Sequence, residues 1–436
     1  MSKTCNGGAL PSRRYAAAGP VAPVLTIAFI PHDLSETAIK PRHSKTKKSM
    51  RTLKHTVLAC LIGGLGAINS HGQFTFNSGS DGSYGPMNIT TNTTLALPTN
   101  GIFNCTTITI ATSATLKFTP NALNTPVYLL ATGNVTINGT IDVSGAQGAV
   151  SLDGAGGPGG FAGGNAAYLG LQPSDGHGPG AGRAGTTESW GISTNLAGYA
   201  SYGTSGNNGD GGNGAIYGSP LLIPLVGGSG GGGRPSKGGS GGGGAILIAS
   251  STSIAIGGAI LSQGGGYANV YDGVGSGGAI RLVSPVVSGN GSLSVYSSAY
   301  MSGGYGRIRI DCMDRHSLAL TYNPSSVGSI GANMVVFPAN PPRLDITQVA
   351  GTNIPVGTNS AVFFTLPQGS STNQNVIVQA SNFSNSVSIR VVLPPDNGSS
   401  TSYDTQIDNT TVNPASVTVP VVLPVNVQVQ VNAWTR

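Results

Sequence analysis

A pattern of alternating apolar and polar residues recurs in the middle of this chain. Apolar residues occupy every second position over four or five residues, and Gly, Asn and Ser separate these segments. The pattern runs over residues 127–145, returns over 245–264 and occurs a third time over 279–296. A period of two residues is typical of β-strands, whose successive side chains point to opposite faces. We therefore expect each copy to form one coil of a β-solenoid, which buries its apolar face by stacking on its neighbours.

The copies predict an all-β protein built on a right-handed parallel β-helix over residues 102–311. Residues 73–101, rich in turn residues, Thr and Asn, are expected to cap the first coil. A glycine-rich insertion over 144–244 interrupts the coils, and we expect it to form long loops held by scattered aromatic side chains. Residues 312–342 are expected to form a C-terminal cap and linker.

The composition changes after this linker, where glycine becomes scarce and Val, Thr, Gln and Pro take over. Seven segments alternate with strand period and are separated by turn residues: 344–349, 361–366, 375–380, 386–393, 402–407, 415–423 and 425–434. This spacing predicts a small immunoglobulin-like or fibronectin-like β-sandwich over 343–436, with Trp434 in its core.

The composition of the 436-residue chain supports many short strands and does not support helical bundles, because it has 69 Gly and only 8% charged residues. The formal net charge of +6 is misleading. Ten of the 21 basic residues and two of the 15 acidic residues precede residue 73, which leaves 11 basic and 13 acidic residues in the remainder. No stripe of Lys and Arg survives there, so a nucleic-acid partner is not expected.

The charged residues before and after residue 73 are counted separately because residues 50–72 have the pattern of a signal peptide. A basic start at Met50 is followed by an apolar run over 56–68, with small residues at Ser70 and Gly72. Residues 1–49 are then an upstream, disordered extension, and the mature protein is exported to the cell surface or medium, with the periplasm as the alternative. We expect no transmembrane anchor in the mature chain.

Export implies an oxidising compartment, yet only Cys105 and Cys312 follow the signal peptide. In a solenoid, residues this far apart in sequence are too distant for a disulfide. We expect two buried, unpaired thiols.

Four stretches support a resemblance to a known group: residues 127–145, 156–164, 275–283 and 306–310. They resemble a group of exported, glycine-rich bacterial proteins of unknown function, which are usually drawn as right-handed parallel β-helices and are loosely similar to adhesin and autotransporter passenger domains. The resemblance covers roughly residues 74–340. It implies a fold and a surface location, and it assigns no catalytic residue.

Parallel β-helices also host polysaccharide lyases and hydrolases, which need carboxylates gathered on one face. The candidate carboxylates are Asp142, Asp153, Asp175, Glu188, Asp210, Asp272, Asp311 and Asp314. Most are isolated in sequence. The sequence around His177 and the pair Arg307 and Arg309 resemble two elements of the polygalacturonase family, but the paired aspartates of that family are missing. We therefore expect no catalytic residue, with His177 a loop histidine and the arginines an outward row on a strand.

Metal chemistry has little support. Only His177 and His316 follow the signal peptide, so a zinc site is not expected. Asp-Gly pairs at residues 81, 153, 175, 210 and 272 are ordinary turn chemistry, although acidic turns with free carbonyls can also bind Ca²⁺. A Ca²⁺ site is left open, and no other cofactor or metal is expected.

These patterns together predict an exported structural or adhesive protein of a surface or matrix, non-catalytic, with carbohydrate binding open. The expected partner is a polysaccharide or a cell-surface or matrix component, and self-association is a further option. The alternative is a polysaccharide lyase or glycoside hydrolase, which would require three or more carboxylates aligned in one groove.

Overall fold

The structure is a computed structural model, and it describes most of the chain after residue 74. The described residues are 75–167, 170, 172–186, 196–206, 213–266, 272–297, 303–358, 361–383, 385–395, 398–424 and 426–435. Strands dominate, and the helical element among these residues is one 3₁₀ turn, Ser325–Val327. The predicted all-β class is confirmed. The predicted extension over 1–49 and signal peptide over 50–72 lie outside the described residues.

The largest sheet has nine strands, and every pair within it is parallel. Its strands are β1 (Gly85–Ile89), β3 (Ile102–Ile110), β5 (Val127–Ala131), β6 (Val135–Ile137), β8 (Ala245–Ser250), β9 (Ser253–Ile256), β11 (Ala279–Ser288), β13 (Arg307–Asp314) and β15 (Gly328–Gly331). Strands that are distant in sequence are neighbours in the sheet. For example, β5 pairs with β8, although the glycine-rich part of the chain lies between them in sequence.

The pairing within this sheet returns to its start. The path β3, β5, β8, β11, β9 and β6 closes back on β3, so six parallel strands form a closed, barrel-like ring. The prediction of a right-handed parallel β-helix was therefore wrong.

The ring closes because β3 and β11 are long enough to pair twice. In β3, residues 102–105 pair with β5 and residues 108–110 pair with β6. In β11, residues 279–283 pair with β8 and residues 286–288 pair with β9. The repeat over 279–296 predicted strands of four or five residues, but β11 runs for ten residues with no Gly within it.

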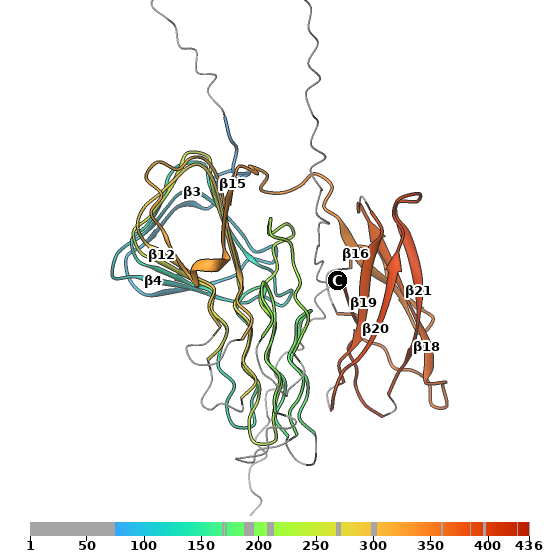
Figure 1. Ribbon diagram of the computed structural model, residues 1–436. Helices are drawn as coiled ribbons and strands as arrows, with labels where there is room; N and C mark the ends of the chain where they lie inside the picture. The colour runs from blue at the N-terminus through green and yellow to red at the C-terminus, as the bar shows by residue number, and fades with distance from the viewer. Residues whose placement is uncertain are drawn as a thin grey trace, which may run out of the picture. The chain divides into compact units, whose positions relative to one another are not determined.

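A second parallel sheet of six strands shares a core with the first. Its strands, in spatial order, are β14 (Thr321–Asn323), β12 (Ser292–Ser294), β10 (Ala259–Leu261), β7 (Thr140–Asp142), β4 (Thr115–Thr119) and β2 (Thr93–Ala96). Ile108 and Ile246 of the large sheet and Leu116 and Ile260 of this sheet belong to one cluster of buried residues. Figure 1 shows β3, β4, β12 and β15 arranged around this interior.

The free thiols lie in this same core. Cys105 and Cys312 are unpaired and buried, as predicted. Burial raises the pKa of Cys105 to about 11 and also raises the pKa of Cys312, because a thiolate is poorly solvated there.

We expect Cys105 to resist alkylation in the folded protein. Reaction requires a thiolate, and both the raised pKa and the lack of exposure suppress it. Iodoacetamide at pH 8, followed by mass spectrometry of the Cys105 peptide, should show no label without denaturant and full label in denaturant. Rapid labelling of the native chain would contradict the packing described.

The glycine-rich part of the chain contains extended segments joined by backbone hydrogen bonds. The amides of residues 238–245 donate to three neighbouring segments in turn, reaching each one at every third residue. The pairs are Gly238 to Ala149, Gly241 to Ala146 and Gly244 to Val143; Gly239 to Gly164, Gly242 to Phe161 and Ala245 to Pro158; and Ser240 to Gly273 and Gly243 to Ser276. A period of three residues is that of a polyproline II helix. Figure 1 shows such segments running side by side.

Close backbone approach explains the glycine content of this bundle of extended segments. A Cβ atom at Gly241 would overlap the carbonyl oxygen of Ala155, and one at Gly230 would overlap that of Ala162. Side chains would therefore separate the segments and break their hydrogen bonds. Where the structure describes them, the long loops expected from the sequence are extended segments joined to one another by backbone hydrogen bonds.

A second buried cluster covers the outer face of the large sheet. Tyr202 and Tyr217 pack against Leu247 and Ala279 of β8 and β11. The two tyrosine rings lie 4.6 Å apart between centroids, and their hydroxyls donate to the carbonyls of Val226 and Gly227. The described aromatic residues of the glycine-rich region, Phe161, Tyr199, Tyr202 and Tyr217, are thus buried core residues.

Two antiparallel sheets follow residue 342 and enclose a third buried cluster. The four-stranded sheet contains β17 (Thr352–Asn353), β16 (Arg343–Val349), β18 (Asn373–Ser381) and β21 (Ala415–Val422), and the three-stranded sheet contains β20 (Thr401–Ile407), β19 (Val387–Leu393) and β22 (Asn432–Thr435).

Three details of this part differ from the sequence prediction. Residues 361–366 form no strand, and the strand expected over 425–434 is limited to β22. Trp434 belongs to the cluster on the outer face of the large sheet, where its ring lies 5.5 Å from that of Phe161, and it does not fill the core of the antiparallel sheets. The alternation predicted a buried ring, but it could not say on which side.

Candidate functional site

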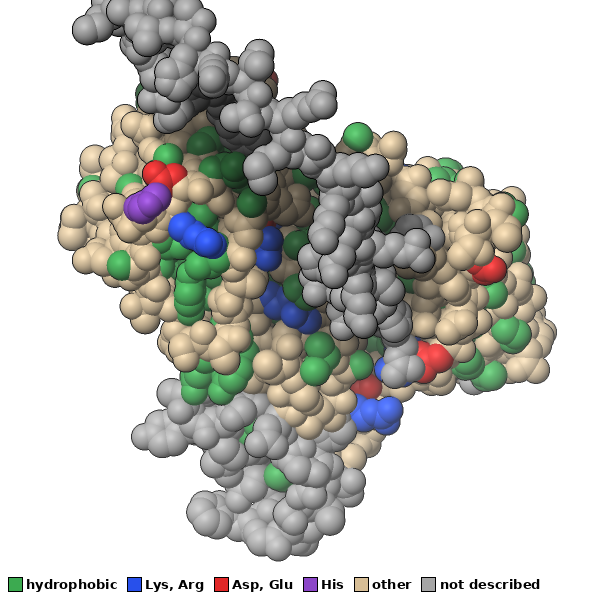
Figure 2. All heavy atoms as spheres, turned by 45° about the horizontal axis from the view of Figure 1, so that its top comes forward, with side chains coloured by type: hydrophobic (Ala, Val, Ile, Leu, Met, Phe, Trp, Pro, Cys, Tyr) green, Lys and Arg blue, Asp and Glu red, His purple; other side chains and the backbone are tan. Residues whose placement is uncertain are grey.

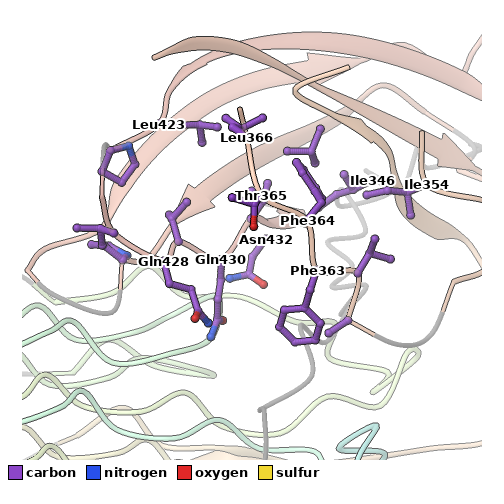
Figure 3. A pocket seen from close by; sticks show the side chains of 18 of the residues that line it. Ile346, Ile354, Phe363, Phe364, Thr365, Leu366, Leu423, Gln428, Gln430 and Asn432 are labelled. Atoms are coloured by element: carbon purple, nitrogen blue, oxygen red, sulfur yellow. The ribbon is translucent and has the colours of Figure 1, made fainter. Parts of the chain in front are cut away.

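A cavity of about 990 Å³ is lined mainly by residues that connect and edge the antiparallel sheets. This volume is at the upper end of the range for small-ligand sites. Figure 3 shows Phe363, Gln428, Gln430 and Asn432 around it. We call it the amide–aromatic cavity, after these four residues.

The amides come from a stretch in which valine and amide residues alternate. Gln428, Gln430 and Asn432 are two residues apart, whereas Val429 and Val431 between them pack against the core of the antiparallel sheets. The two valines also line part of the cavity, and Figure 3 shows the side chains of the three amides beside it. Their backbone spacing is about 6.6 Å from one amide to the next.

The amides of the two glutamines are available to a ligand. Neither the Gln428 nor the Gln430 side chain forms a hydrogen bond with another described residue, although the Gln430 backbone N–H donates to the carbonyl of Pro394. Each amide offers two donors and a carbonyl acceptor. The row can therefore both donate to and accept from hydroxyl groups.

An exposed aromatic ring forms another part of the wall. Phe363 is 65% exposed and Phe364 is 39% exposed, and Val362 beside them is also exposed. Figure 3 shows the Phe363 ring near the amide row. An apolar ring beside unpaired amides is a combination that suits a ligand with both apolar faces and hydroxyl edges.

Charge is sparse at this site. Asp345 is buried in the wall, where its Oδ1 accepts hydrogen bonds from the Arg343 guanidinium (2.6 Å) and the Gly357 N–H (3.1 Å). Within the described part of the chain, the Oδ2 atom of Asp345 has no hydrogen-bond partner. The wider surface shares this character, since most of the face shown in Figure 2 is uncharged.

The histidine and arginines that resemble polygalacturonase elements lie in different environments. His177 lines the amide–aromatic cavity, with its backbone N–H donating to the carbonyl of Ala162. Arg307 lies over the Tyr202 ring, 5.7 Å from its centroid, and donates to the Tyr217 carbonyl. Neither Arg307 nor Arg309 lines the cavity, so the structure does not bring the histidine and the arginines together there.

The candidate carboxylates are distributed over separate elements, and four of the eight lie within ion-pair distance of a basic side chain. The pairs are Asp142 with Lys117 (3.0 Å), Asp272 with Arg234 (2.8 Å) and Lys237 (2.6 Å), Asp311 with Arg281 (3.3 Å) and Arg309 (2.6 Å), and Asp314 with His316 (2.7 Å). Burial raises the pKa of Asp142, but hydrogen bonds from Ser144 and Lys117 outweigh it and hold the pKa below its usual value.

The remaining carboxylates divide three ways. Asp175 accepts hydrogen bonds from the backbone N–H groups of Ala184 (2.7 Å) and Ser400 (2.9 Å). Asp153 lines the cavity. Glu188 and Asp210 lie outside the described residues. Among the described residues, no three His, Cys, Asp or Glu side chains are grouped so that they could hold a metal ion.

No helix within the described ranges is both long and apolar enough to cross a membrane. A scan against protein-family models found no match, and searches of the curated proteins and of the solved structures found none either. The interpretation of the cavity therefore depends on its own residues.

The amide row was not identified as a site from the sequence. Its pattern is visible, because Asn426, Gln428, Gln430 and Asn432 alternate with valines over residues 425–432. This alternation predicts a strand. The additional clue was that all four polar positions are amides, where a solvent-facing strand commonly mixes Thr, Lys and Glu.

Proposed function

We propose that this protein is an exported structural or adhesive protein that holds a polysaccharide, without catalysis, in the amide–aromatic cavity. The observation that carries the proposal is the amide row beside the exposed Phe363 ring, in which the Gln428 and Gln430 side chains form no hydrogen bond with another described residue. An aromatic face can stack on the C–H face of a sugar ring while amides exchange hydrogen bonds with its hydroxyls.

The rest of the molecule supports a structural role. The bundle of extended segments is hydrogen-bonded through its backbone, and most of the molecular face shown in Figure 2 is uncharged. Such a framework can present a binding site rigidly, which reduces the entropy lost on binding. Export rests on the signal-peptide pattern over residues 50–72.

Replacing Phe363 with alanine should weaken polysaccharide binding by about tenfold, because a stacked aromatic ring contributes about 1 kcal/mol or more beyond its buried area. Isothermal titration with soluble oligosaccharides measures the change. Phe337→Ala is a matched control, since that ring is 47% exposed and does not line the cavity. Equal losses in both variants would show that Phe363 is not part of the binding site.

A further inference from the structure

Charge around the amide–aromatic cavity distinguishes two classes of polysaccharide. Among the described residues that line it, there is no Lys or Arg, whereas Asp153 and Asp345 are present. The nearby Arg343 guanidinium is held by Asp345 through two hydrogen bonds, of 3.2 and 2.6 Å. Apart from His177, a carboxylate-bearing ligand would therefore meet no basic side chain among the described lining residues.

Acidic polysaccharides need such cations. Carboxylates are recognised by Arg forks or Lys ammonium groups, and burial of an unpaired carboxylate is unfavourable. A neutral sugar has only hydroxyls and ring oxygens, which side-chain amides satisfy as both donors and acceptors. The lining of the cavity therefore suits neutral polysaccharides and disfavours acidic ones.

We infer that the cavity selects an uncharged polysaccharide, whose hydroxyls are read by Gln428, Gln430 and Asn432, and rejects polyuronates. This inference rests on the proposed function. The inference extends that function, because the preference for neutral over acidic polysaccharides comes from the lack of Lys and Arg in the described lining as much as from the amides.

The test compares neutral and acidic hexasaccharides on the full chain. The probes are cellohexaose, mannohexaose and xylohexaose, against hexagalacturonate, by isothermal titration in low salt. At least one neutral probe should bind about tenfold more tightly than hexagalacturonate.

A change of one cavity residue should shift this preference. Gln428→Lys places an ammonium group at the wall and should tighten hexagalacturonate binding by about tenfold while weakening the neutral probe. Gln406→Lys adds the same charge on an exposed strand position that does not line the cavity, and it should change neither.

The outcomes separate the two claims. Tighter binding of hexagalacturonate by the unaltered chain would overturn the neutral preference and leave polysaccharide binding standing. Equal gains in Gln428→Lys and Gln406→Lys would also overturn the inference, because the effect would come from net charge alone. Lack of binding to every probe would overturn the proposed function and the inference with it.

Discussion

Replacing Gly241 with alanine is expected to destabilise the protein by more than about 3 kcal/mol, beyond the usual cost of overpacking a core. Gly241 donates its N–H to Ala146 and accepts from the Gly265 N–H, and an added Cβ would overlap the Ala155 carbonyl oxygen. The clash is with backbone, so no side-chain rotation relieves it. Chemical denaturation measures the loss.

Gly266→Ala is the matched control in the same region. A Cβ there meets nothing within 4 Å, and the backbone does not require a positive φ. Its expected effect on the free energy of unfolding is within about 0.5 kcal/mol. A similar midpoint for both variants would contradict the close approach of the extended segments.

Replacing Asp311 with alanine is expected to cost about 3–5 kcal/mol, the loss typical of removing one partner from a buried ion pair. Asp311 is fully buried in β13 and lies between Arg281 (3.3 Å) and Arg309 (2.6 Å). Burial lowers the pKa of Arg281, and the charge of Asp311 opposes that shift. Without Asp311, two guanidinium groups would share the region without a counter-ion.

The reverse substitution should be milder. Arg281→Met removes a buried guanidinium whose Nε and Nη1 atoms have no hydrogen-bond partner among the described residues. Asp311 would keep Arg309 and the Asn333 N–H (2.9 Å). We expect a loss well below that of Asp311→Ala, because methionine fills similar space without a desolvated charge.

An exposed pair supplies the control for this comparison. Asp404→Ala breaks the ion pair with Arg390 (2.7 Å), in which both side chains are partly exposed. Its expected cost is about 0.2–1 kcal/mol. Thermal and denaturant unfolding of the three variants should rank Asp311→Ala as the most damaging, and any other order would contradict the buried network.

Alternation of apolar residues predicted the individual strands well and their assembly poorly. The copies near residues 127, 245 and 279 do form parallel neighbours, β5, β8 and β11. The closed ring was missed because it depends on β3 and β11 each being long enough to pair with two other strands. Strand period reports which side chains face inward, and it does not report how far a strand extends or which partners it takes.

The glycine-rich segments were harder to interpret from sequence. Their period of three lies in backbone hydrogen bonds, and glycine carries no side chain that would reveal it. The alternation of the amide row, in contrast, is visible in the sequence. Phe363 lies in a segment that the sequence predicts as a strand, although the structure has no strand there. The cavity brings together residues about 65 positions apart, which no local pattern indicates.

The proposal that the amide–aromatic cavity holds a polysaccharide is tested most directly with the double substitution Gln428→Leu and Gln430→Leu. The full-length chain and this variant are titrated with neutral polysaccharides while reducing ends and unsaturated products are assayed. We expect the unaltered chain to bind without releasing product and the variant to lose that binding while its unfolding midpoint is retained. Release of product, or binding that survives both substitutions, would contradict the proposal.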